Sequence, residues 1–419
     1  MLTYQQALET VLRTLSPLPA EELPLPEALG RALARDVVAG WDMPPADNSA
    51  MDGFAFAHAS LALRDELQVA GTARAGGGFA QKVSVGAAVK IMTGAPLPEG
   101  CDTVVALEDV VEDAGRIRPR KPVKKGDHVR YRGEEFREGE ELLKEGTTLR
   151  AGEIGLLASA GVARVQVYRQ PRVALLTTGD ELVDLGVRPG PGQIVNSNLY
   201  LISARLREEG CTVWPLAIAS DQRGALTERL AQGLEADLLL TTGGVSMGDY
   251  DLVQSCLNDL GFQLGFWKVA IKPGKPVLFG TVKGTPVFGL PGNPAAAAAT
   301  FQLFVRPALR RLAGYRDPLA PHCRAILTAR VHGGGSRQCF LWGRIDEEQG
   351  RYLFTPASRQ SSGQNRGMQQ AQALLAVPAH SPDLHRGDEV EVMLLYLPQG
   401  NFRGPGAIGV DNRQPSLDE

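Results

Sequence analysis

Oxygen-bearing side chains follow three apolar runs in the sequence. The runs and their ends read RVALLTTGDEL at residues 172–182, ADLLLTTGGVSMGDYD at residues 236–251 and PVFGLPGNP at residues 286–294. The side chains concerned are those of Thr177, Thr178, Asp180, Glu181, Thr242, Ser246, Asp249, Asp251 and Asn293. A fourth stretch, FWKVAIKPGKP at residues 266–276, contributes Lys268, Lys272 and Lys275. Ammonium groups beside a crevice suit an oxyanion or phosphates, although lysines on a surface loop are usually only solvated. Their position between two such strand ends favours ligand binding.

The apolar runs predict buried parallel strands, which show near-continuous hydrophobic residues. Gly243 and Gly244 would let the backbone turn sharply or approach a ligand closely. Helical spacing follows at residues 252–260, before a glycine that ends the helix. After the third run, Asn293 suits a helix N-cap and Pro294 a first helical turn. We therefore predict a helix over residues 295–312, with a kink near Pro307.

Alternation of strands and helices predicts a doubly wound sheet between about residues 171 and 315. Within it we expect a helix at 198–209, a strand at 212–219 and a helix capped by Asp221. In such sheets the ligand crevice lies beyond the carboxyl ends of the strands, so the three loops should meet on one side. The alternative is that Thr-Thr-Gly merely turns each strand. Two copies, each followed by carboxylates, favour a functional site.

The regions before and after this sheet carry further candidates. Residues 4–15 predict an amphipathic helix, and the polar stretch 41–56 predicts an ordered loop that presents Asp52, although Asp-Gly is also a common turn signal. Residues 71–138 favour a small β-rich domain, in which Thr93 ends an apolar run. In HVRYRGEEFR, residues 128–137, Arg130, Arg132 and Glu135 either meet a phosphate with its metal or form a solvated charged face. Residues 321–397 favour a β-barrel or sandwich, and residues 398–419 a flexible tail.

Composition excludes several classes of protein. The 419 residues are 43% hydrophobic and 22% charged, with a formal charge of −3 and no dense basic run, which makes nucleic acid an improbable partner. Five scattered cysteines without a C-x-x-C pair argue against structural zinc and disulfides and fit a reducing cytoplasm. No apolar run is long enough to span a bilayer, so we expect no membrane association.

Six motifs in order give the sequence a family resemblance. They are DNSAMDG (47–53), MTGAPLPEG (92–100), TTGDEL (177–182), TTGGVSMGDYD (241–251), WKVAIKPGKP (267–276) and GLPGNP (289–294). Together they resemble the MoeA family, the molybdopterin molybdenumtransferases, which includes the E domain of gephyrin. The likeness covers about residues 5–397. One departure is Ala295-Ala296, where the family usually has a small residue followed by serine.

The resemblance implies a multidomain α/β fold. A central doubly wound MogA-like α/β domain would comprise residues 1–17 and 169–317, and a β-rich inserted domain residues 42–138. Residues 18–41 and 139–168 would form an elongated linking domain, residues 318–397 a C-terminal β-barrel-like domain, and residues 398–419 the tail.

The activity implied by the resemblance is insertion of molybdate into adenylylated molybdopterin, with release of AMP and dependence on Mg²⁺. The family is homodimeric, and its site lies between the α/β domain of one subunit and the inserted and C-terminal parts of its partner. Transient contact with the adenylyltransferase and with molybdoenzymes, and a cytoplasmic location, are also implied. No nucleic-acid or membrane partner is expected.

The resemblance also assigns site residues. Those with a catalytic role would be Asp52, Glu181, Asp251, Lys268 and Lys272, of which Asp52, Glu181 and Asp251 would bind the metal. Those that bind substrate would be Thr93, Glu135, Asp180, Asp221, Thr242, Gly243, Gly244, Ser246, Lys275, Pro291, Asn293, Pro294 and Ser362.

Two other functions compete with this interpretation. A molybdopterin adenylyltransferase would share the α/β domain, but DNSAMDG and the C-terminal domain argue against it. A non-catalytic scaffold of the gephyrin type is the other, and the carboxylates of Asp52, Glu181 and Asp251 favour an enzyme over it.

Overall fold

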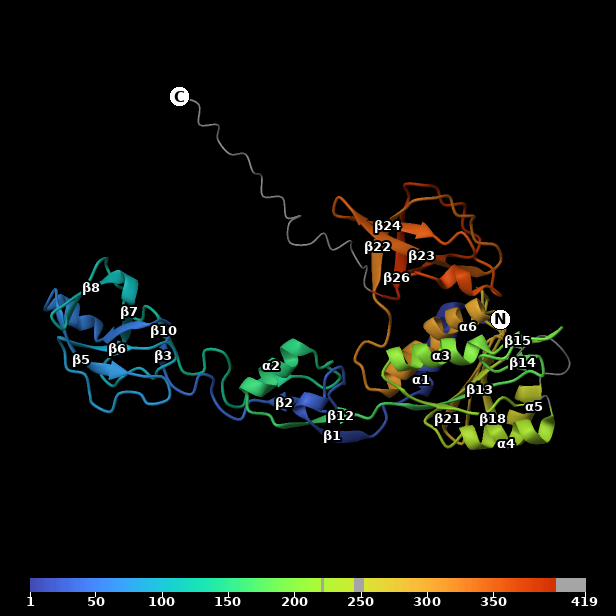
Figure 1. Ribbon diagram of the computed structural model, residues 1–419, viewed down its shortest axis with the longest axis horizontal. Coiled ribbons are helices and arrows are strands. Elements are labelled where there is room, and N and C mark those ends of the chain that lie inside the picture. The colour runs from blue at the N-terminus through green and yellow to red at the C-terminus, as the bar shows by residue number, and fades with distance from the viewer. Residues whose placement is uncertain (220–221, 245–251, 397–419) are drawn as a thin grey trace, which may run out of the picture. The chain divides into compact units, whose positions relative to one another are not determined.

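The computed structural model describes residues 1–219, 222–244 and 252–396. The chain forms two compact units (Figure 1). One unit joins Met1–Pro19 to the chain from Tyr168 onward, and the other is Ala20–Val167. No helix of the described residues is long and apolar enough to cross a membrane.

The first unit contains a six-stranded sheet in the order β16-β13-β17-β21-β20-β18. Its strands are β13 (Arg172–Thr177), β16 (Thr212–Pro215), β17 (Leu238–Thr242), β18 (Phe262–Trp267), β20 (Leu278–Val282) and β21 (Thr285–Leu290). The first four strands in the sheet order are parallel to one another. Strand β20 is antiparallel to both of its neighbours, β21 and β18. The predicted strands β13, β17 and β21 therefore lie side by side.

Helices cover both faces of this sheet, which confirms the doubly wound fold (Figure 1). The helices are α1 (Tyr4–Thr14), α3 (Ser197–Glu208), α4 (Arg223–Gly233), α5 (Leu252–Asp259), α6 (Pro294–Thr300) and α7 (Arg306–Leu312). Successive residues of a strand point to opposite faces. Val173 and Leu175 accordingly pack in the core with α1, α3, α6 and α7, while Ala174 and Leu176 pack in the core with α4 and α5.

Local sequence explains where these helices begin. Thr3 and Gln6 form a reciprocal capping box at the start of α1, the helix that was predicted for residues 4–15. In α3 the N-cap is Asn196, whose side chain accepts a hydrogen bond from the backbone N–H of Leu199. In α4 the N-cap position is held by Gln222, and Asp221, the predicted cap, lies outside the described residues.

The helix predicted over residues 295–312 is broken into three parts. Between α6 and α7 lies a π-helical turn, Phe301–Val305, and Pro307 is in the first turn of α7. A proline has no N–H to donate to the preceding turn, so the interruption precedes it, as the predicted kink anticipated. Asn293 holds the N-cap position of α6 and Pro294 its first turn, as predicted, but the Asn293 side chain makes no capping hydrogen bond, and its Nδ2 donates to Ser362 Oγ at 3.2 Å.

A closed barrel follows the α/β part. It consists of β22 (His322–Leu327), β23 (Gln338–Glu348), β24 (Arg351–Pro356), β25 (Ala373–Val377) and β26 (Glu389–Leu394). Pairing of β23 with both β24 and β25 closes the ring, which confirms the predicted barrel-like fold. Strand β19 (Ile271–Lys272) also pairs with β23. Phe340 and Trp342 of the barrel share one buried core with Phe304 of the α/β part.

The second unit is rich in β-structure, as predicted. Its largest sheet has the order β7-β4-β6-β5-β9-β8. The strands are β4 (Gly53–Phe56), β5 (Leu67–Ala73), β6 (Ala87–Ile91), β7 (Thr103–Ala106), β8 (Val110–Asp113) and β9 (Arg116–Pro119). The remainder contains helix α2 (Ala151–Ser159) and the paired strands β2 (Val37–Val38) and β11 (Glu141–Leu143). The finer four-part division of the chain stays a prediction.

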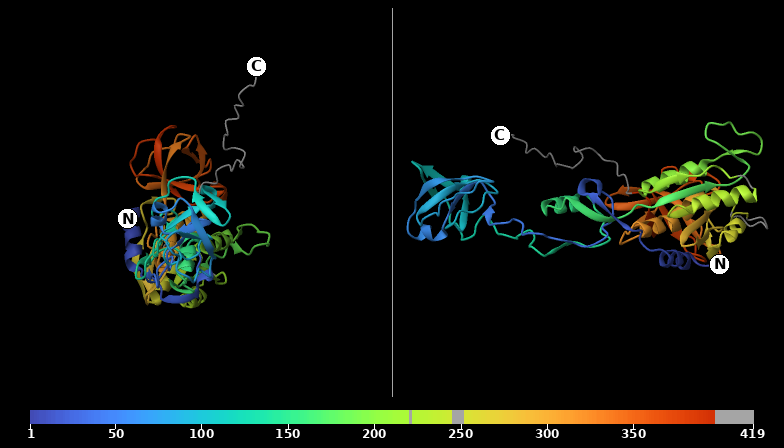
Figure 2. Two further views of the ribbon diagram at one scale, coloured as in Figure 1. Left: turned by 90° about the vertical axis from the view of Figure 1, so that its left-hand side faces the viewer. Right: turned by 90° about the horizontal axis from the view of Figure 1, so that it is seen from below.

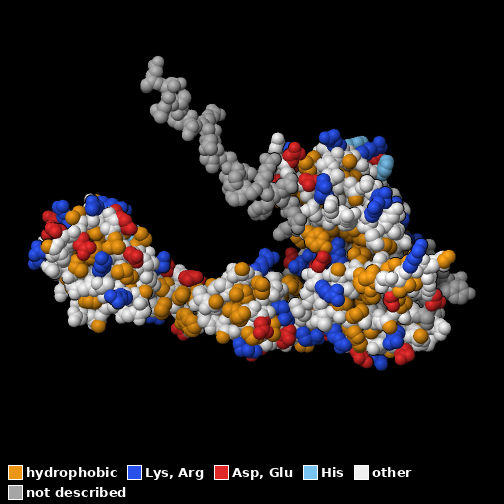
Figure 3. Space-filling model, viewed as in Figure 1, with side chains coloured by type: hydrophobic (Ala, Val, Ile, Leu, Met, Phe, Trp, Pro, Cys, Tyr) orange, Lys and Arg blue, Asp and Glu red, His pale blue; other side chains and the backbone are white. Residues whose placement is uncertain are grey.

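Basic and acidic side chains are interspersed on the face shown in Figure 3. This mixture agrees with the near-neutral composition of the chain.

Candidate active site

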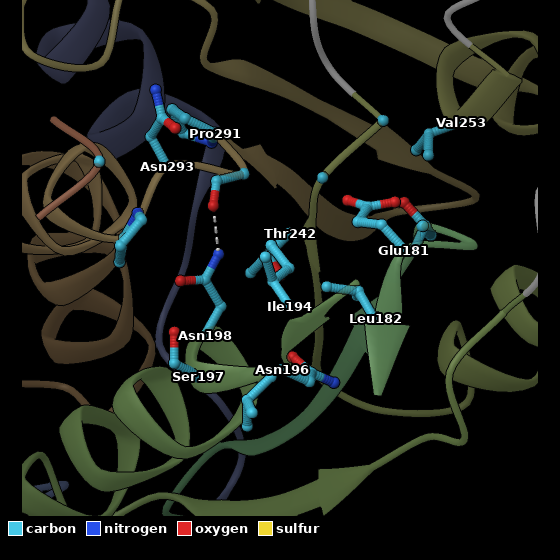
Figure 4. Close-up of a pocket in the computed structure, with 18 of the residues that line it drawn as sticks. Glu181, Leu182, Ile194, Asn196, Ser197, Asn198, Thr242, Val253, Pro291 and Asn293 are labelled. Atoms are coloured by element: carbon cyan, nitrogen blue, oxygen red, sulfur yellow. Dashed lines mark hydrogen bonds between the residues drawn. The ribbon is translucent and has the colours of Figure 1, made fainter. Parts of the chain in front are cut away.

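A cavity of about 800 Å³ lies at the carboxyl ends of β13, β17 and β21 (Figure 4). The loops that follow these three strands all line it, so they meet on one side of the sheet as expected. The lining residues from these loops are Thr178, Gly179, Glu181, Thr242, Gly243, Gly244, Pro291, Gly292, Asn293 and Pro294. Gly363 and Asn365, which follow β24 of the barrel, line another part of the wall.

Two glycines allow the loop after β17 to pack against the loop after β13. Gly243 and Gly244 have φ values of 87° and 65°. A Cβ atom on Gly243 would lie 2.6 Å from the carbonyl oxygen of Thr178, and one on Gly244 would lie 2.5 Å from Cγ2 of Val253. A larger residue at Gly243 would therefore push the two loops apart, and one at Gly244 would collide with α5. The Thr178 hydroxyl is buried beneath them and has no hydrogen-bond partner among the described residues.

Glu181 brings a carboxylate to the cavity. Its backbone carbonyl accepts a hydrogen bond from Ile194 N at 2.9 Å, where β14 (Leu182–Val183) runs parallel to β15 (Ile194–Val195). Figure 2 shows the segment between these strands as a green loop that extends away from the sheet. No hydrogen bond or ion pair to the Glu181 carboxylate is found within the described part of the chain, so its charge is available to a ligand. Asp180 is exposed and does not line the cavity.

The start of α3 supplies polar residues that sequence reasoning missed. Asn196 is buried, and its Nδ2 donates to Thr177 Oγ1 at 2.8 Å. Asn198 Nδ2 donates to the Gly292 carbonyl at 2.8 Å, and Figure 4 shows this bond beside the cavity. The signal in the sequence is Asn-Ser-Asn at a predicted helix start, directly after a glycine- and proline-rich loop. Such residues were expected only to begin a helix.

Ser362 of the barrel contacts the loop after β21 from another element. Its backbone carbonyl accepts a hydrogen bond from Ala295 N at 2.9 Å, which satisfies one of the free N–H groups at the start of α6. Its hydroxyl accepts the Asn293 bond described above. The barrel therefore holds the loop that carries Pro291, Asn293 and Pro294.

The three lysines do not line the cavity. The Lys268 ammonium lies 3.5 Å from the centre of the Trp267 ring, and this residue has a φ of 68°. Lys272 is exposed in β19, opposite Cys339 of the barrel. The Lys275 carbonyl accepts a hydrogen bond from Val269 N. Pro276 is the part of this segment that reaches the wall.

Asp52, Thr93 and Glu135 belong to the second unit. Asp52 Oδ1 accepts hydrogen bonds from Thr93 N at 2.7 Å and from Thr93 Oγ1 at 2.8 Å. These two donors hold the pKa of the Asp52 carboxyl below its usual value, because they stabilise the charged form. Glu135 lines a separate cavity of about 340 Å³ with Met43, Pro44, Asn48, Arg130 and Glu134.

Some predicted site residues lie outside the described residues. They are Asp221, Ser246 and Asp251, together with Asp249. Within residues 1–219, 222–244 and 252–396, no group of three or more His, Cys, Asp or Glu residues could hold a metal ion. The predicted metal ligands Asp52, Glu181 and Asp251 thus stay a prediction.

Comparison with protein families matches three parts of the chain. Residues 2–161 match the MoeA N-terminal region (domain I and II), and residues 174–311 match a probable molybdopterin binding domain. Residues 324–395 match the MoeA C-terminal region (domain IV). The cavity is lined mainly from the second of these parts.

Individual relatives cover most of the chain. A molybdopterin molybdenumtransferase of Haemophilus influenzae is 38% identical over 358 residues, covering 84% of this chain and 87% of the relative. Another, of a Nostoc species, is 36% identical and covers 88% of this chain and 87% of the relative. The crystal structure of a molybdopterin biosynthesis MoeA protein of Pyrococcus horikoshii superposes with a TM-score of 0.82 at 29% identity, covering 94% of this chain and 100% of that chain.

Proposed function

Because the chain belongs to the MoeA family of molybdopterin molybdenumtransferases, we propose that its cavity inserts molybdenum from molybdate into adenylylated molybdopterin, with release of AMP. The chain is an enzyme of molybdenum cofactor biosynthesis. One observation carries the proposal: the cavity of about 800 Å³ is built by TTGDEL, TTGG and GLPGNP in the part that matches a molybdopterin binding domain. Its size is within the range of small-molecule sites.

The proposed metal ligands are all carboxylates, which would suit a hard divalent cation. The Glu181 carboxylate at the cavity has no partner in the described ranges, and Asp52 uses only Oδ1 for its two hydrogen bonds from Thr93. Carboxylates together with substrate phosphates are the usual ligands of Mg²⁺. We propose that Glu181, Asp52 and Asp251 hold it. When bound, Mg²⁺ would neutralise phosphate charge and polarise the anhydride.

The remaining residues bind and orient the substrates in this proposal. Lys268, Lys272 and Lys275 would attract molybdate or a phosphate, since their segment ends at Pro276 in the cavity wall. Thr242 and Asn293 line the cavity and present polar groups to the ligand. Thr93 keeps the Asp52 carboxyl ionised through its two hydrogen bonds. The hydroxyls of Ser246 and Ser362, with Glu135, Asp180 and Asp221, complete the set of proposed substrate contacts.

The oligomeric state, partners and compartment are also proposals. The family resemblance implies a homodimer, which sedimentation velocity would distinguish from a monomer. A cytoplasmic location is supported by five cysteines that are all free. Transient contact with the adenylyltransferase and with molybdoenzymes would follow from passing a pterin substrate along, and a pulldown with each purified enzyme would detect it.

The decisive experiment identifies the leaving group. Purified chain given adenylylated molybdopterin, Mg²⁺ and molybdate should release AMP only when molybdate is present. Asp52→Ala should abolish this release and leave pterin binding intact, because the cavity is built without that residue. The exposed Asp65→Ala is the matched control and should behave as wild type. Release of pyrophosphate from ATP and molybdopterin would instead identify an adenylyltransferase, and pterin binding without turnover a scaffold.

A further inference from the structure

The loops after β13 and β21 are both fastened to the first turn of α3. Asn196 bonds to Thr177 at the end of β13, and Asn198 bonds to the Gly292 carbonyl beyond β21. Gly292 in turn lies against the loop after β17, since a Cβ on it would be 3.7 Å from Gly243 Cα. The spacing of the cavity walls thus depends on two asparagines that are two positions apart in one helix.

The two asparagines differ in what else they do. Asn196 is 2% exposed and also caps α3 through the N–H of Leu199, so it supports the fold itself. Asn198 is only half-buried, lines the cavity and makes one side-chain hydrogen bond, to Gly292. Its Oδ1 has no partner among the described residues. The Asn198 side chain therefore serves the position of the third loop and not the stability of its own helix.

The chemistry of this bond fixes the orientation of the carboxamide. A backbone carbonyl only accepts, so the amino group of Asn198 must face Gly292. Glycine at 292 has no side chain that could hold the loop by packing, and the two prolines of the loop, Pro291 and Pro294, have no backbone N–H to donate. Hydrogen bonds from outside the loop must therefore position it. Asn198 supplies one on the α3 side, and Ser362 supplies the contacts on the barrel side.

We infer that Asn198 is a positioning residue for substrate binding: its Nδ2 holds the Gly292 carbonyl and so sets where Pro291, Asn293 and Pro294 meet the ligand. This inference rests on the proposed function for the identity of the ligand. The hydrogen bond from Asn198 to the Gly292 carbonyl, here called the tether, is itself a property of the structure. Because the bond is formed without a ligand and is not made only in the transition state, we expect its loss to weaken substrate binding more than it slows the chemical step.

The first test uses full-length Asn198→Ala with adenylylated molybdopterin as the probe. We expect the dissociation constant to rise between about threefold and tenfold, the effect of losing one hydrogen bond of ordinary strength. The melting temperature should stay within about 2 °C of wild type. Asn258→Ala, at an exposed position of α5, is the matched control and should leave both values unchanged. Unchanged pterin affinity in Asn198→Ala would overturn the inference.

A second variant separates the tether from simple loss of a side chain. In Asn198→Asp the protonated acid can donate to the Gly292 carbonyl, whereas the carboxylate repels it. Pterin affinity of this variant should therefore approach wild type at low pH and fall below that of Asn198→Ala as the new carboxyl ionises. If Asn198→Asp and Asn198→Ala show the same pH profile, the Gly292 bond does not position the loop.

Amide hydrogen exchange makes the test independent of the ligand. Two hydrogen-bonded N–H groups flank this loop, that of Gly243, which donates to the Leu290 carbonyl, and that of Ala295, which donates to the Ser362 carbonyl. Without the Asn198 bond, these two N–H groups should exchange faster in Asn198→Ala than in wild type or Asn258→Ala. If wild type binds no pterin while this exchange still accelerates, the proposed function fails and the positioning role stands. If exchange is unchanged, the positioning role fails whatever the ligand.

Discussion

Asp52 and Thr93 form a pair in which one residue sets the charge of the other. Two Thr93 donors lower the pKa of the Asp52 carboxyl, so this side chain stays ionised at a pH where an ordinary aspartate begins to protonate. A group whose pKa is depressed by folding favours the folded state above its unfolded pKa, and that contribution disappears as pH falls through the folded value. The Asp52 carboxylate is therefore available to a cation down to a lower pH than an ordinary aspartate would be.

Thr93→Val tests this pairing. The substitution removes the hydroxyl donor and keeps the backbone N–H, so the pKa of Asp52 should rise part of the way to its ordinary value. The acid limb of the kcat/KM profile should move to higher pH in the same direction. Carbon NMR titration of the Asp52 carboxyl measures the shift. Thr72→Val, at an exposed position of β5, serves as the control and should leave the titration unchanged. If the titration of Asp52 does not respond to Thr93→Val, the Thr93 hydroxyl does not contribute to the lowered pKa of Asp52.

Residue types at strand ends were enough to indicate the cavity, but not all of its walls. Thr178, Glu181 and Thr242 follow apolar runs, and such positions in parallel sheets share one edge. Asn198 had the appearance of a helix start, and Gly363 and Asn365 belong to a barrel whose closure depends on pairs far apart in sequence. Spacing along the chain carries no information about such distant pairs. The lysines of residues 266–276 were expected at the cavity, whereas only Pro276 of that segment lines it.

At the scale of elements, the apolar runs predicted the central strands of the α/β sheet better than the strands at its edge. Continuous hydrophobic residues in β13, β17 and β21 reflect burial on both faces of the sheet. Strands β18 and β20 pair antiparallel at the edge, and β19, which lies between them in the chain, pairs with β23 of the barrel. The short segment from Trp267 to Pro276 thus had too little periodicity to show that it connects two sheets.

Gly274 shows how tightly that connection packs. Its φ is 104°, and a Cβ atom there would lie 2.4 Å from Cγ2 of Thr300 in α6. Gly284, in the turn between β20 and β21, has a φ of 89° but nothing within 4 Å of the same position. Both glycines avoid backbone strain, and only Gly274 also avoids a collision.

We therefore expect Gly274→Ala to lower the free energy of unfolding by about 1 to 3 kcal/mol more than Gly284→Ala does, the cost of overpacking. Urea denaturation of the two variants measures the difference. Because Gly274 lies between Lys272 and Lys275, the first variant should also weaken molybdate binding if those lysines hold the oxyanion. Equal losses of stability would mean that Thr300 moves aside at no cost.

At the scale of the whole molecule, the buried cores follow the two units. Phe340 and Trp342 of the barrel share a core with Phe304 and with α1, and Tyr4 contacts Phe340 with ring centroids 5.2 Å apart. In the second unit, Phe54 lies in a different core. The barrel and the α/β part should consequently unfold together, separately from the β-rich unit.

Calorimetry of two phenylalanine variants tests this division. Phe340→Ala should lower the melting temperature of one transition and Phe54→Ala that of the other. Each substitution should lower the free energy of unfolding of its unit by about 3 to 5 kcal/mol, the cost of removing a buried phenylalanine ring. Both side chains are at most 1% exposed, so the substitutions are matched in burial. A single transition shifted by both variants would show that the two units unfold as one.

The second unit interrupts the first in sequence, and this order matters for synthesis. Helix α1 is translated before its packing partners Phe266, Phe304 and Phe340, which follow more than two hundred residues later. The β-rich insertion between Pro19 and Tyr168 can complete its own cores in the meantime. Until those partners are translated, the apolar stripe of α1, with Ala7, Leu8 and Val11, has none of its native packing contacts with them.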